Sequence, residues 1–85
     1  MGCVMKLYDY HGKYNCSGPR ILARRKELRL SQEQLAAKLQ LQGLEITQRA
    51  ISRIETGARV VPDFEIHFFA KALDVSPLWL LEDDD

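Results

Sequence analysis

The sequence lacks the features that mark membrane and secreted proteins. Its longest apolar runs are only a few residues long, well short of the ~20 apolar residues that span a bilayer. Charged side chains between Lys6 and Lys13 interrupt the N-terminal segment, where a secretory signal needs an apolar core. Lys6 also stands where a myristoylation signal beginning at Gly2 prefers Ser or Thr. We therefore expect a soluble, intracellular protein that is not bound to a membrane.

Cysteines and catalytic patterns are also scarce. Cys3 and Cys16 are the two cysteines, too few for a disulfide framework, and neither is spaced from other Cys or His residues as zinc ligands are. No Ser/His/Asp set, phosphate-binding loop or pair of catalytic carboxylates is evident, and His67 has the pattern of an ordinary helix residue. The sequence predicts no metal, no cofactor and no enzyme activity.

The chain carries no net charge, but its charge is unevenly distributed. Residues 1–59 contain 11 Lys and Arg against 5 Asp and Glu, whereas residues 60–85 contain 1 against 7. A local basic face attracts phosphates more than a total charge does. Two interpretations stay open on charge alone: a nucleic-acid-binding face, or solvated helices balanced by an acidic tail.

Eighty-five residues predict one domain, flanked by two short segments. Residues 1–18 form an arm that carries three tyrosines, with Gly12 and Gly18 as breakers. The alternation from Val4 to Tyr10 before Gly12 favours a weak hairpin, and an arm without order is the open alternative. Residues 19–82 carry helical patterns, and residues 83–85 form an acidic tail.

Start and stop signals predict five short helices. Pro19 suits the first position of a helix, and Ser31 with Gln34 forms a capping box for the second. The third helix is predicted over residues 48–56, with Thr47 as its N-cap and Gly57 as its left-handed end. The fourth is predicted over 64–73 with Asp63 as its cap, and Ser76-Pro77 opens the fifth, with Ser76 at the N-cap position. These elements indicate an all-α fold with an irregular N-terminal arm.

The third predicted helix has one apolar and one polar face. Ile51 and Ile54 point inward, whereas Gln48, Arg49 and Ser52 are polar and lie near its N-terminal end. Gln can pair with adenine through two hydrogen bonds, and Arg can pair with guanine in the same way. The N-terminal end is the part of a recognition helix that enters the major groove most deeply. We expect this helix to contact double-stranded DNA.

Three sequence blocks resemble the Cro/cI-type helix-turn-helix domain of phage repressors and XRE regulators, a lambda-repressor-like fold. They are LSQEQLAAKL (residues 30–39), ITQRAISRIETG (46–57) and AKALDVSPLWLL (70–81), in the order that the family has. The resemblance covers Arg20 to Glu82. It implies a cytoplasmic protein of prokaryotic or phage origin and a sequence-specific regulator of transcription, most often a repressor.

The resemblance also implies roles for individual residues. It places Gln32 at a backbone phosphate and beside the first base-contacting side chain, and it pairs Arg25 with Glu55 in an ion pair between helices one and three. Arg53 is left open between a phosphate contact and a solvated side chain. The residues implied at the DNA are Gln32, Thr47, Gln48, Arg49, Ser52, Arg53 and Arg59.

The chain departs from the family pattern in three places. Six residues, 40–45, separate Leu39 from Ile46 where the family most often has a single Gly. Arg29 stands where a Gly usually ends helix one, which implies strain if Arg29 is left-handed. Ala58, Val60 and Val61 replace a more basic loop, so minor-groove contacts are expected to be weaker there.

One domain of this kind covers half of a DNA site, so a homodimer on a palindromic operator is expected. The candidate dimer surface comprises the apolar residues Val60, Val61, Phe68, Trp79 and Leu80; for Trp79 and Leu80, burial in the core is the alternative. Two other functions stay open. The chain could be an antitoxin that also binds a toxin, or a protein-interaction module that has lost DNA binding.

Overall fold

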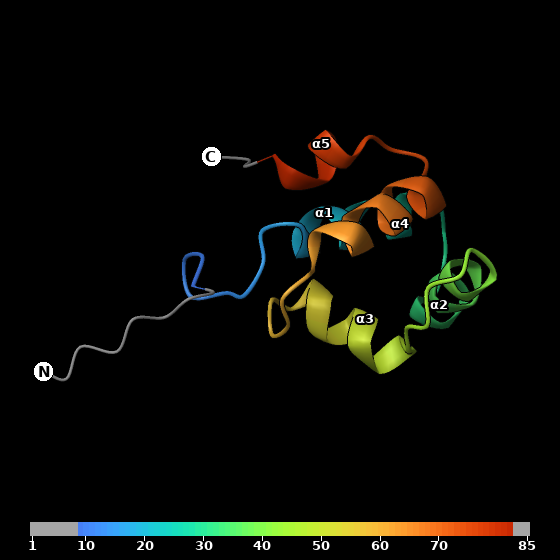
Figure 1. Ribbon diagram of the computed structural model, residues 1–85, viewed down its shortest axis with the longest axis horizontal. Helices are drawn as coiled ribbons and strands as arrows, with labels where there is room; N and C mark the ends of the chain where they lie inside the picture. Colours follow the sequence, from blue (N-terminus) through green and yellow to red (C-terminus); the bar gives the residue numbers. More distant parts are fainter. Residues whose placement is uncertain (1–8, 83–85) are drawn as a thin grey trace, which may run out of the picture.

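The computed structural model describes residues 9–82, which form five helices and no strand within that range (Figure 1). Residues 1–8 and 83–85, including Cys3 and the acidic tail, lie outside the described residues. The helices are α1 (Gly18–Glu27), α2 (Gln32–Leu41), α3 (Gln48–Glu55), α4 (Asp63–Leu73) and α5 (Pro77–Leu81). The predicted all-α fold is confirmed.

The helices enclose one apolar core. Helix α1 contacts α3, α4 and α5, and α2 contacts α3 and α4. In Figure 1, α2 and α3 lie together below the layer formed by α1, α4 and α5. The side chains that are fully buried include Ile21, Leu35, Leu39, Ile51, Ile54, Phe69, Leu73 and Leu80. Every helix therefore contributes to the core, and α3 has apolar support along its inner face.

Three predicted N-caps are confirmed. Ser31 accepts a hydrogen bond from the Gln34 backbone at 3.0 Å, while the Gln34 side chain accepts one from the Ser31 backbone at 2.8 Å. Thr47 caps α3 by accepting from Ala50, and Ser76 caps α5 by accepting from Trp79. Each cap satisfies a backbone N–H that has no partner inside its helix.

The predicted cap of the fourth helix is wrong. Asp63 is the first residue of α4, and Pro62 precedes it in an extended conformation with no side-chain cap. Pro62 has the φ that its ring imposes, −57°, but an extended ψ of 151°, so Pro62 is the last residue outside the helix and α4 begins one residue earlier than expected. The Asp63 carboxylate then lies in the first turn, where the helix dipole favours negative charge.

The six residues 40–45, which precede α3, lengthen α2 and form a loop that is held by a side-chain hydrogen bond. Helix α2 continues to Leu41, and Gln42 is its C-cap. The Gln40 amide donates to the backbone oxygen of Ile46 at 2.8 Å, directly before the N-cap of α3. The longer connection thus has its own link to the start of α3.

Arg29 has a left-handed backbone, with φ +60°. A side chain there crowds its own backbone at a cost of about 1–2 kcal/mol.

We expect the free energy of unfolding of Arg29→Gly to be about 1 kcal/mol higher than that of Arg29→Ala. The matched control is exposed Lys38 in α2, where Ala should be more stable than Gly by about 1 kcal/mol. Denaturant unfolding of the four variants measures both differences, and the same order at both positions would contradict the prediction.

The described part of the arm contains a tight turn and ends where α1 begins. Tyr10 and Lys13 exchange two backbone hydrogen bonds, of 2.7 and 2.9 Å, across His11 and Gly12. The hairpin predicted from the alternation is present as this single bridge, and its residues before Asp9 lie outside the described range. Helix α1 starts at Gly18, one residue before the predicted start.

Candidate nucleic-acid interface

Helix α3 presents a polar face to solvent. Ile51 and Ile54 are fully buried on its inner side, whereas Gln48 and Arg49 are exposed and Ser52 is half-buried. Thr47 and Arg53 are also exposed. The period of the helix therefore separates the apolar side chains that anchor it from the polar side chains that a ligand can reach.

Arg25 and Glu55 form a buried ion pair between α1 and α3. Arg25 Nε and NH2 donate to the two Glu55 carboxylate oxygens at 2.7 and 3.1 Å. Their side chains are 10% and 4% exposed. Arg25 NH1 also donates to the Leu30 backbone oxygen at 2.7 Å. Because each charge is paired and hydrogen-bonded, the pair orients α3 without leaving a buried charge uncompensated.

The same carboxylate begins a chain of side-chain hydrogen bonds that leads to the surface. Gln32 Nε2 donates to Glu55 Oε1 at 2.8 Å, and Gln32 Oε1 accepts from Gln48 Nε2. The Glu55 acceptor sets which end of the Gln32 amide faces Gln48. Gln48 consequently keeps its Oε1 and one N–H of its Nε2 for an external partner.

The C-terminal end of α3 closes in a left-handed turn, as predicted for Gly57. Its φ is +82°, a conformation that glycine adopts without steric cost. The Gly57 N–H donates to Ile54 at 3.0 Å, and the Ala58 N–H donates to Arg53 at 2.7 Å. These two bonds form a Schellman motif, which satisfies two of the last carbonyls of the helix.

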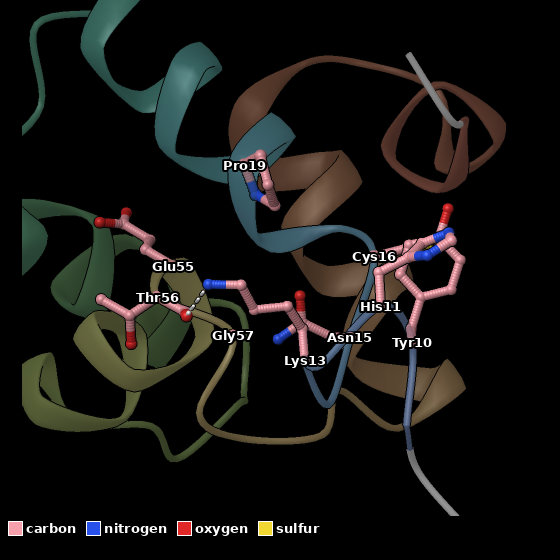
Figure 2. A pocket seen from close by; sticks show the side chains of 9 residues that line it. All are labelled: Tyr10, His11, Lys13, Asn15, Cys16, Pro19, Glu55, Thr56 and Gly57. Carbon is pink, nitrogen blue, oxygen red and sulfur yellow. Dashed lines mark hydrogen bonds between the residues drawn. The ribbon is translucent and has the colours of Figure 1, made fainter. Parts of the chain in front are cut away.

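The arm lies against this same end of α3. Lys13 Nζ donates to the Thr56 backbone oxygen at 3.3 Å, and the Tyr14 N–H donates to the Gly57 oxygen at 2.8 Å. Figure 2 shows the Lys13 side chain reaching across to Thr56. Between the arm and the last turn of α3 is a hollow of about 200 Å³. The arm also packs closely on this turn, because a Cβ added to Gly57 would clash with the Lys13 side chain.

Arg59 is held by a carboxylate within the protein. Its NH1 and NH2 donate to Glu65 at 2.8 and 3.1 Å, and Glu65 is 6% exposed. The hydrogen bond to Glu65 raises the pKa of Arg59 above its ordinary value, against a smaller lowering by burial. A raised pKa stabilises the fold below the unfolded-state pKa, so this contribution is lost only in strongly alkaline solution. The phosphate contact predicted for Arg59 stays a prediction, with Glu65 as a competing partner.

Leu80 does not belong to a dimer surface, because it is fully buried in the core. Trp79 is half-buried, packs against the core and has the Arg20 guanidinium 4.6 Å from its ring centroid. The alternative that placed these two residues in the core is therefore correct for Leu80. Val60, Val61 and Phe68 are half-buried.

Three side chains that help to position α3 were not predicted from the sequence. Asn15, Gln40 and Glu65 each hold a backbone or a charge next to α3. Asn15 contacts residues 39 and 44 positions away, for which a single sequence carries no signal. Glu65 was detectable only as an acidic residue in the first turn of a helix.

Two further findings concern the described residues 9–82. None of their helices has the length and apolar character needed to cross a membrane. In the same range, no group of three or more His, Cys, Asp or Glu side chains is placed to hold a metal ion.

The chain matches a known family. The helix-turn-helix family model matches residues 21–80, a range that begins within α1 and ends within α5. No curated protein matches the chain. The matched range includes α2, α3 and the Arg25–Glu55 pair, and that family consists of DNA-binding regulators. The chain belongs to the Cro/cI-type helix-turn-helix family of DNA-binding regulatory proteins.

Proposed function

We propose that this protein is a sequence-specific regulator of transcription, acting as a repressor, that reads the major groove of double-stranded DNA with α3. The observation that carries the proposal is the hydrogen-bond chain from buried Glu55 through Gln32 to exposed Gln48. A solvated surface helix has no need for a buried charge that orients an exposed amide. A base-reading helix does, because discrimination depends on where the side-chain donors and acceptors point.

The orientation of Gln48 supports a preference for adenine. Its free N–H can donate to adenine N7, and its free Oε1 can accept from adenine N6. Arg49 is exposed and has no partner among residues 9–82, so its guanidinium is available to a guanine or a phosphate. Thr47, Ser52 and Arg53 lie on the same helix surface and are proposed as flanking contacts.

A palindromic operator bound by a homodimer is part of the proposal, because one recognition helix covers half of a site. Val60, Val61, Phe68 and Trp79 remain the candidates for the dimer surface. An antitoxin of this fold would bind DNA in the same way. A neighbouring toxin gene, and a complex formed with its product, would distinguish that function from a simple repressor.

Selection of binding sites from random duplex DNA tests the proposal. We expect a motif with two inverted half-sites. Gln48→Ala should lose discrimination of about 1–3 kcal/mol at one base position, and Arg49→Ala should weaken binding as well. Lys71→Ala, at an exposed position of α4, is a charge-matched control for Arg49→Ala, and it should keep the motif. If no motif emerges, or if both α3 variants bind as the wild type does, α3 is not the reading element.

A further inference from the structure

Asn15 joins three separate parts of the fold at the C-terminal end of α3. Its Nδ2 donates to the backbone oxygens of Ile54 at 3.1 Å and of Arg59 at 2.7 Å. Its Oδ1 accepts from the Gly18 N–H at 2.8 Å. Both amide hydrogens and one oxygen lone pair are thus in use. A single side chain links the last turn of α3, the loop after it and the start of α1.

The neighbouring arm residues complete this closure. After the Schellman motif, the oxygens of Thr56 and Gly57 still need donors. Lys13 and Tyr14 supply one each. The Lys13 ammonium also brings a positive charge to the negative end of the helix dipole. All three consecutive residues, 13–15, therefore donate to backbone oxygens between residues 54 and 59.

Backbone packing shows how closely α1 and α3 meet beside Asn15. A Cβ added to Gly18 would lie 2.2 Å from the Ile54 oxygen, the same atom that accepts from Asn15. The N-terminal end of α1 consequently contacts the C-terminal end of α3 directly. Any shift in the arm would be transmitted to the last turn of α3, because Asn15 and the Gly57 N–H both donate to the Ile54 oxygen.

We propose that residues 13–15 are the C-terminal cap of the recognition helix, with Asn15 as a positioning residue that sets the angle of α3. The consequence for DNA rests on the proposed function of α3, whereas the cap itself does not. The arm then belongs to the DNA-binding unit, because it orients α3 from the end opposite to Gln48. It acts through helix orientation and need not contact a base.

Two variants of Asn15 separate its role as a hydrogen-bond donor from its role as an acceptor. Asn15→Asp keeps an acceptor for Gly18 but removes both donors to Ile54 and Arg59, and Asn15→Ala removes all three bonds. Val75→Ala is a control for general destabilisation, since Val75 packs on the core in the loop between α4 and α5. Amide hydrogen exchange at Gly57 and Ala58 measures the closure. Affinity for selected and for random DNA is measured at one salt concentration and at a temperature where every variant is folded.

Both Asn15 variants should speed exchange at Gly57 and Ala58 about tenfold, since two hydrogen bonds of ordinary strength are lost. Affinity for the selected site should fall about tenfold, while affinity for random DNA, which depends on phosphate contacts, should stay within about twofold. Val75→Ala should leave the ratio of the two affinities unchanged.

If the Gly57 and Ala58 amides of Asn15→Asp exchange at the wild-type rate, residues 13–15 do not cap α3. Faster exchange with an unchanged affinity ratio would overturn the positioning role. If the wild type selects no DNA site, the proposed function fails, and the exchange measurement still decides whether residues 13–15 cap α3.

Discussion

Replacing Glu55 with Ala is expected to lower the free energy of unfolding by about 3–5 kcal/mol. The change leaves the Arg25 guanidinium in a site where its side chain is 10% exposed, without the carboxylate that it faces at 2.7 Å. A small domain is stable by only about 5–15 kcal/mol. A large share of the stability of this protein should therefore depend on that one carboxylate.

Thermal and denaturant unfolding measure the loss. The double variant Arg25→Met, Glu55→Leu removes both charges together and should recover most of it, because an apolar pair of similar size avoids the cost of an unpaired buried charge. That double variant should still lose the Gln32 bond and bind its DNA site poorly. A Glu55→Ala protein within about 1 kcal/mol of the wild type would show that water reaches and solvates Arg25.

Replacing Gly18 with Ala is expected to cost about 3 kcal/mol, at the upper end of the range for overpacked interiors. The new Cβ would lie 2.2 Å from the Ile54 oxygen and 2.9 Å from Asn15 Oδ1. The first of these is backbone, so no side-chain rotation relieves it. Relief requires α1 and α3 to move apart, which should also weaken the Asn15 bonds.

Gly43→Ala is the informative control. Gly43 has a φ of +101°, but a Cβ there meets nothing within 4 Å, so its cost is backbone strain alone, about 1–2 kcal/mol. Gly18 has an ordinary helical backbone, so its cost is space alone. Equal losses in the two variants, measured by denaturant unfolding, would mean that α1 and α3 can separate freely at this point.

Local chemistry explains why much of the fold was predictable. A cap such as Ser31 with Gln34, or a helix end such as Gly57, is decided within four to six residues of chain, and its pattern is visible in the sequence. The prediction of Asp63 as an N-cap was wrong, although it depends on an equally short stretch of chain. Pro62 and Asp63 compete for the N-cap position, and the sequence does not show which residue takes it.

Some of the unpredicted contacts join distant segments. Asn15 reaches residues 54 and 59, and only the folded arrangement of α1, α3 and the arm brings these together. Arg59 illustrates a second difficulty, which arises at short range. Its charge and position suggested a phosphate contact, but a carboxylate six residues later is within hydrogen-bond distance in the fold. Composition gives a charged residue several plausible partners, and geometry selects among them.

The hydrogen-bond chain that ends at Gln48 has a consequence for engineering new DNA preferences. Position 48 cannot be changed alone, because its side chain must also match Gln32, which in turn matches Glu55. Arg49 stands outside that chain, so libraries that vary it, together with half-buried Ser52, should yield folded proteins with altered base preference at high frequency. Libraries at position 48 should need a compensating change at position 32 to yield the same.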